Sequence, residues 1–175
     1  GGVLEDPQGN PFGFEILIVS AEQERLAAVF QRALSRLGID VSLRMLDDAQ
    51  IQQRKQTYDF DMLISSVGFS GTLSPGIEQI GRWGSEAAKV EGSFNLAGVA
   101  NPGVDAMIDA MLNARDRESY VAAVRALDRL LISGAYVIPT QYSSDVWVSY
   151  WNYLEHPETS PLNGFDLSAW WRKPE

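Results

Sequence analysis

The sequence predicts an α/β fold in which a mixed β-sheet is flanked by helices. Strand-like and helix-like segments alternate through the first third of the chain, and two amphipathic helices followed by strand-like runs occupy the second half. The length of 175 residues allows one sizeable core. A hydrophobic content of 45% beside 21% charged residues is typical of a globular domain.

The first predicted strand leads into an amphipathic helix. Residues 12–19 alternate and then become continuously apolar, which favours a strand. Ser20 and Gln23 have the spacing of a capping box, and Gly38 suits a left-handed helix stop. The apolar positions between them predict one buried stripe: Leu26, Val29, Phe30, Ala33, Leu34 and Leu37.

Two more strands and a polar helix complete a β-α-β-α-β order. Residues 39–46 alternate between apolar and polar side chains, which predicts a strand with one solvated face. Asp47 or Asp48 can cap a helix that runs to about Lys55, and residues 61–67 read as a third strand.

The second half predicts two helices and two strands. Asn101 with Pro102 begins one helix, and Asp116 caps another that Gly134 ends. Residues 136–142 and 146–151 read as strands, the first at a sheet edge because it contains a proline. Asp105 is expected to be a surface or capping residue. The apolar stripes of the two helices are Val104, Met107, Ile108, Met111 and Leu112, and Tyr120, Val124, Leu127, Leu130 and Leu131.

Composition narrows the possible partners and chemistry. The net charge of −9 repels phosphate backbones and anionic lipid, so neither nucleic acid nor a membrane surface is an expected partner. No apolar run is long enough for membrane insertion, and we expect any export signal to be absent from this piece of chain. The absence of cysteine excludes disulfides and thiolate nucleophiles. With His156 as the single histidine, expected to be a solvated loop residue, we predict no metal site and no cofactor.

Paired carboxylates are the remaining candidates for chemistry. Asp59 and Asp61 flank Phe60, and Asp47 is next to Asp48, so an acid/base pair or an oxygen-ligand cation site is conceivable. Strand-end and helix-cap roles explain both pairs more simply. We therefore predict no catalytic residues, and a carboxylate-dependent hydrolase is kept as an alternative.

A long glycine-rich segment, residues 62–84, begins as a strand and continues as a loop. Its glycines lack the spacing of a nucleotide phosphate loop. Small residues at the carboxyl end of a strand let a ligand approach the backbone, and Phe69 and Trp83 offer flat apolar faces. The segment predicts a ligand-binding loop, although the same residues would also suit a loop that only packs.

The run SFNLAGVANPGVDAMIDAMLNARDRESYVAAVRALDRLLISGAYVIPTQYSS resembles the carboxyl-terminal lobe of family 5 extracellular solute-binding proteins, the oligopeptide-, dipeptide- and nickel-binding components of ABC importers. Upstream, AAVFQRALSRLGIDVSLRML and YDFDMLISSVGFS are similar to the same lobe. SPGIEQIGRWGS and GFDLSAWW are most similar to the branch for peptide antibiotics and larger peptides. Five residues match the family pattern N-x-x-G-x-x-N-P-x-x-D: Asn95, Gly98, Asn101, Pro102 and Asp105.

The resemblance implies a periplasmic-binding-protein-like lobe at residues 1–150, inserted in a larger protein. Residues 151–175 would be a segment that returns towards an absent first lobe. The implied protein is a monomer in the periplasm or at the cell surface, is not an enzyme, and delivers a peptide-like solute to an ABC permease. The implied mechanism is closure of two lobes on the solute. A stand-alone interaction domain that binds a protein through its aromatic tail is the other alternative.

The resemblance also implies which residues meet the solute. Ser66 and Gly68 would form hydrogen bonds, Phe69, Ser70 and Trp83 would line the wall, and Arg82 would meet an anionic group. Peptide binders of the family commonly place an aspartate after the strand to bind the ammonium group of the peptide. No acid stands there in this sequence, and Glu78 is the candidate substitute.

Overall fold

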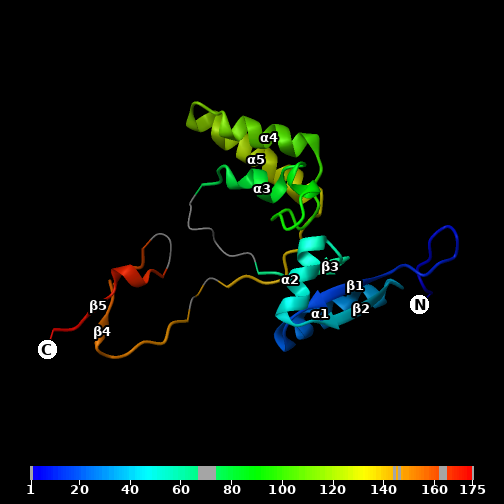
Figure 1. Ribbon diagram of the computed structural model, residues 1–175, viewed down its shortest axis with the longest axis horizontal. Coiled ribbons are helices and arrows are strands. Elements are labelled where there is room, and N and C mark those ends of the chain that lie inside the picture. Colours follow the sequence, from blue (N-terminus) through cyan, green and yellow to red (C-terminus); the bar gives the residue numbers. More distant parts are fainter. Residues whose placement is uncertain (1, 67–73, 144, 146, 162–164, 175) are drawn as a thin grey trace. The chain divides into compact units, whose positions relative to one another are not determined.

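A computed structural model describes residues 2–66, 74–143, 145, 147–161 and 165–174 (Figure 1). The chain divides into two compact units, Gly1–Val67 with Gly76–Ile138, and Gly68–Pro75 with Pro139–Glu175. This division falls earlier than the boundary at residue 150 suggested by the resemblance, and the assignment of a lobe to residues 1–150 stays a prediction.

The first unit contains a parallel sheet in the order β2-β1-β3. The strands are β1 (Gly13–Ile18), β2 (Asp40–Met45) and β3 (Met62–Leu63). Central β1 is buried on both faces. Ile16 and Ile18 pack with α1 (Ala21–Ser35), whereas Leu17, on the opposite face, packs with Ile51 of α2 (Asp48–Thr57). The predicted β-α-β-α-β order is confirmed.

The predicted cap of α1 is confirmed, but its buried stripe is only partly right. Ser20 Oγ accepts the Gln23 N–H at 3.2 Å, and Gln23 Oε1 accepts the Val19 N–H at 2.8 Å. The core contact centres on buried Ala27, with Phe30 and Leu34 beside it. A small residue at the contact lets the helix approach the sheet closely. The outer side of the predicted stripe is exposed: Val29, Ala33 and Leu37.

The turn after α2 links the sheet to the segment that follows α3 in sequence. Asp47 caps α2 as predicted, and the helix ends at Tyr58, which has a φ of +54°. The Tyr58 hydroxyl donates to the Val90 carbonyl at 2.9 Å and lies 2.6 Å from Ser93 Oγ. The third strand is shorter than the predicted 61–67. The Ile64 N–H still donates to the Leu17 carbonyl, but the next two residues, Ser65 and Ser66, are exposed to solvent.

The helical part of the first unit contains α3 (Glu78–Trp83), a short 3₁₀ turn at Ala87–Lys89, α4 (Pro102–Leu112) and α5 (Arg117–Ser133). Helices α4 and α5 pack side by side (Figure 1). The predicted caps are confirmed, since Asn101 accepts the Gly103 N–H and Asp116 accepts the Ser119 N–H, both at 2.8 Å. Their common core contains Val99, Val104, Ile108 and Leu127. Leu112, predicted to be buried, is exposed at the helix end.

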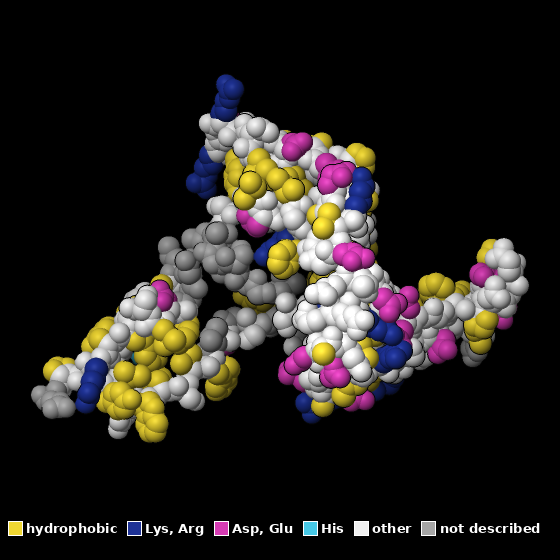
Figure 2. Space-filling view, viewed as in Figure 1, with side chains coloured by type: hydrophobic (Ala, Val, Ile, Leu, Met, Phe, Trp, Pro, Cys, Tyr) yellow, Lys and Arg dark blue, Asp and Glu magenta, His cyan; other side chains and the backbone are white. Residues whose placement is uncertain are grey.

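The second unit is small and rich in exposed aromatic side chains. It contains an antiparallel pair, β4 (Leu154–Glu155) and β5 (Trp171–Arg172), and a 3₁₀ turn at Leu167–Ala169. The Trp170 ring contacts the rings of Tyr150, His156 and Phe165. Figure 2 shows the hydrophobic side chains gathered on this part of the chain.

The two strands predicted at residues 136–142 and 146–151 are wrong, because the residues described in these ranges form none. A strand requires a hydrogen-bonding neighbour. Pro139, within the first of these ranges, has no backbone N–H to donate to one. The predicted α/β class is nevertheless confirmed by the parallel sheet and its helices. Across the described part of the chain, no helix combines the length and apolar character that a bilayer crossing requires.

Candidate ligand-binding site

The predicted binding loop begins where the parallel sheet ends. Ser66 is exposed just beyond β3. Gly68, Phe69 and Ser70, also predicted to meet the solute, lie outside the described residues. In parallel sheets, ligands commonly bind at the carboxyl ends of the strands, which is where Ser66 stands.

The other two predicted site residues, Arg82 and Trp83, are neighbours in the last turn of α3. Trp83 is half-buried and packs against the core formed by α4 and α5. This packing gives Trp83 a structural role that needs no ligand. Arg82 is also half-buried, and its side chain forms no hydrogen bond or ion pair with another described residue.

Glu78, the candidate replacement for the missing aspartate, stands one turn before Arg82 on α3. Its Oε1 accepts the Gly76 N–H at 2.9 Å and the Gln79 side-chain N–H at 3.1 Å. The bond from Gly76, then that from Gln79, and to a smaller degree the charge of Arg82, hold the pKa of Glu78 below its ordinary value. Glu78 is thus anionic at neutral pH.

Sequence reasoning missed the network that holds the end of α3. Asn95 has an exposed fraction of 0%, and its Nδ2 donates to the carbonyls of Gly84 and Val99 at 3.1 and 2.9 Å. Asp105, expected to be a surface or capping residue, is half-buried and bonds Ser85 through both carboxylate oxygens. Asn95 and Asp105 both belong to the family pattern, which was the available signal in the sequence.

The paired carboxylates have separate structural partners. Asp61 Oδ2 accepts the Glu15 N–H at 3.0 Å, whereas exposed Asp59 lies 3.6 Å from Arg54 Nε. Asp47 caps α2, as the simpler interpretation predicted. Among the residues that the structure describes, no group of His, Asp or Glu side chains is placed to hold a metal ion.

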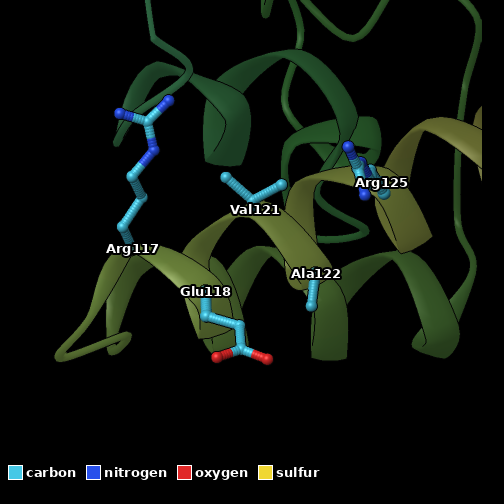
Figure 3. Close-up of a pocket in the computed structure, with 5 residues that line it drawn as sticks. All are labelled: Arg117, Glu118, Val121, Ala122 and Arg125. Atoms are coloured by element: carbon cyan, nitrogen blue, oxygen red, sulfur yellow. The ribbon is translucent and has the colours of Figure 1, made fainter.

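Two surface hollows are lined by residues of other elements than α3. One lies along a face of α5, where Arg117, Val121 and Arg125 point to one side and Glu118 and Ala122 to the other (Figure 3). The other, in the second unit, is bordered by His156, whose Nε2 lies 3.1 Å from the Tyr150 hydroxyl. Neither is lined by a residue predicted to bind the solute.

Comparison with curated proteins finds relatives that cover nearly the whole chain. No protein-family model matches it. A peptidoglycan-binding protein, YepA, of Agrobacterium fabrum is 45% identical over 170 residues, which are 97% of this chain and 27% of that protein. A probable peptide-binding protein, YejA, of the same organism is 40% identical over 164 residues, or 93% of this chain and 26% of that protein. The chain thus spans about a quarter of the length of these relatives.

Solved structures share the fold. The oligopeptide-binding protein AppA of Bacillus subtilis, in complex with a nonapeptide, superposes with a TM-score of 0.72 at 17% identity, over 99% of this chain and 34% of that one. A mannohexaose-bound periplasmic oligopeptide-binding protein of an ABC transporter from Thermotoga maritima gives 0.66 at 24% identity, over 79% and 26%. The chain is therefore homologous to part of longer proteins that are named as peptidoglycan-binding and probable peptide-binding. It shares the fold of periplasmic oligopeptide-binding proteins, in agreement with the resemblance of its motifs to extracellular solute-binding protein family 5.

Proposed function

We propose that this chain is a ligand-binding lobe of the solute-binding component of an ABC importer, and that the whole protein captures a peptide or peptide-like solute. The observation that carries the proposal is the homology over 97% of the chain to a longer binding protein. The parallel sheet supports it, because such sheets commonly bind ligands at the carboxyl ends of their strands. Residues 1–150 form the lobe in this proposal, and residues 151–175 return to the rest of the protein.

The proposed mechanism is closure of two lobes on the solute, without covalent chemistry. Closure removes water from the solute and brings a second wall against the loop after β3. In the proposal Ser66 and Gly68 hydrogen-bond the solute, and Phe69, Ser70 and Trp83 line the wall against which it packs. The closed form is then recognised by an ABC permease, with the protein acting as a monomer in the periplasm or at the cell surface.

The loop is tested by Phe69→Ala in the full-length protein. Loss of an apolar face of this size is expected to weaken binding about five- to two-hundredfold, or roughly 1 to 3 kcal/mol. Calorimetry with a peptidoglycan stem tripeptide, trialanine and mannohexaose measures the affinity and ranks the solute classes. The ligand-free melting temperature should change little. An unchanged affinity for every probe that binds the natural protein would show that Phe69 serves packing and not the solute.

Arg82 is tested through the charge of the solute. If its guanidinium group binds a carboxylate, Arg82→Gln should weaken binding of trialanine about tenfold or more, because a charge-assisted bond is lost. Binding of trialanine amide, which lacks that carboxylate, should be almost unaffected. Arg125→Gln, an exposed substitution on α5, is the matched control. Equal losses for the acid and the amide would remove Arg82 from the proposed site.

The exposed aromatic residues of the second unit favour one alternative, a protein-interaction domain. Trp147 and Tyr142 have exposed fractions of 94% and 90%, and Tyr153, Phe165 and Trp171 of the tail are exposed as well. Deletion of residues 152–175 separates the two functions in a pull-down of the full-length protein. Loss of a bound protein on this deletion, with no loss when the loop after β3 is replaced by a Gly/Ser linker, would favour the interaction domain over solute capture.

A further inference from the structure

We infer that Asp105 and Asn95 form a clamp that fixes the end of α3, and that Asp105 is thereby a positioning residue for Arg82. The inference deepens the proposed function and depends on it for the role of Arg82. The clamp itself consists of hydrogen bonds to a single peptide unit, the one that joins Gly84 to Ser85.

The peptide unit between Gly84 and Ser85 is held at both polar groups. Its carbonyl, on Gly84, accepts from Asn95 Nδ2 at 3.1 Å. Its N–H, on Ser85, donates to Asp105 Oδ1 at 2.8 Å, and the Ser85 hydroxyl donates to Asp105 Oδ2 at 2.6 Å. Bonds on opposite sides of a planar peptide oppose its rotation, so the direction in which the chain leaves α3 is fixed.

Asn95 and Asp105 are themselves anchored. Asn95 is fully buried, and its Oδ1 accepts the Val99 N–H at 2.9 Å. Asp105 lies in the first turn of α4, where its own N–H bonds the Asn101 carbonyl. The clamp therefore connects the short helix α3 to the helical core that α4 and α5 build.

A six-residue helix gains little stability from its own hydrogen bonds. The orientation of α3 must therefore come from its contacts. Trp83 contacts the helical core on one side of the last turn, and Arg82 immediately precedes it. The chain can leave α3 in this way because residue 84 is a glycine, since a Cβ there would lie 2.6 Å from the Ile80 carbonyl oxygen. Release of the clamp should thus make the last turn of α3 mobile and let the Arg82 side chain adopt many orientations. The affinity for the solute then falls, because binding must restrict Arg82 to one orientation at a cost in conformational entropy.

The first measurement needs no ligand. Hydrogen exchange of the full-length protein, read by mass spectrometry, should show exchange about tenfold or more faster in residues 78–85 of Asp105→Ala. Asp109→Ala, an exposed substitution one turn later on α4, is the matched control and should exchange as the natural protein does. Asp105→Asn retains an oxygen acceptor for the Ser85 N–H and should restore most of the protection. Unchanged exchange in Asp105→Ala overturns the clamp, whatever the protein binds.

The second measurement uses calorimetry with trialanine. Asp105→Ala should weaken trialanine binding about tenfold in the otherwise natural protein. In a protein that already carries Arg82→Gln it should have almost no effect, because Asp105 acts on binding through Arg82. Equal losses in both backgrounds overturn the role of Asp105 in positioning Arg82. If the natural protein binds neither trialanine nor a peptidoglycan stem tripeptide, the proposed function fails, together with the positioning role, while the exchange measurement still decides the clamp.

Discussion

Replacing Leu127 by alanine is expected to lower the free energy of unfolding by about 2 to 5 kcal/mol. The side chain is 4% exposed and lies on α5 in the core shared with α4, next to Val104 and Ile108. Its removal takes away buried apolar surface and leaves a cavity that the two helices can fill only in part. Chemical denaturation of the chain, followed by circular dichroism, measures the loss.

The control for this substitution is Ile132→Ala, on the same helix. Ile132 is 71% exposed, so its replacement should change the free energy of unfolding by less than about 0.5 kcal/mol. A cost for Leu127→Ala as small as that of Ile132→Ala would mean that α5 does not bury the face assigned to it.

Replacing Asn95 by alanine is expected to cost about 2 to 4 kcal/mol, because buried polar groups then lose their partners. The Val99 N–H and the carbonyls of Gly84 and Val99 all bond the Asn95 carboxamide in a site without exposure. Thermal and chemical denaturation measure the loss. Asn113→Ala is the control, since exposed Asn113 donates one side-chain hydrogen bond, to the Asp109 carbonyl. Similar costs for the two would contradict the assignment of Asn95 as the organiser of this loop.

The local parts of this fold could be predicted from sequence. Capping by Ser20, Asn101 and Asp116 depends on residues only two or three positions apart, so each cap is visible in the sequence and was confirmed. Helical periodicity likewise located the faces of α4 and α5, with Val104, Ile108 and Leu127 at the core.

The parts that depend on distant partners could not be predicted. Val29 and Leu37 continue an apolar stripe, but the sheet beside α1 does not reach them. The strands expected around Pro139 have no hydrogen-bonding neighbour among the described residues. The bond between Ser85 and Asp105 joins residues twenty positions apart, and no spacing rule reveals it.

The candidate site was predicted from resemblance more than from residue chemistry. Arg82 was expected to meet an anion, and the structure leaves its guanidinium group without an ion-pair partner among the described residues. Trp83 was expected to line the wall of the solute site. Its contact with the core of α4 and α5 joins distant parts of the chain and was not predicted. The roles of Ser66, Gly68, Phe69 and Ser70 stay predictions.

Capture of a peptide-like solute is tested by native mass spectrometry of the full-length protein, purified without added solute. We expect a noncovalent complex whose released ligand fragments into amino acids, and we expect the Phe69→Ala variant to lose this complex. A ligand that proves to be an oligosaccharide or a metal chelate would contradict capture of a peptide-like solute. Release of a cleaved peptide, abolished by Asp61→Asn, would contradict the absence of covalent chemistry and would favour a hydrolase.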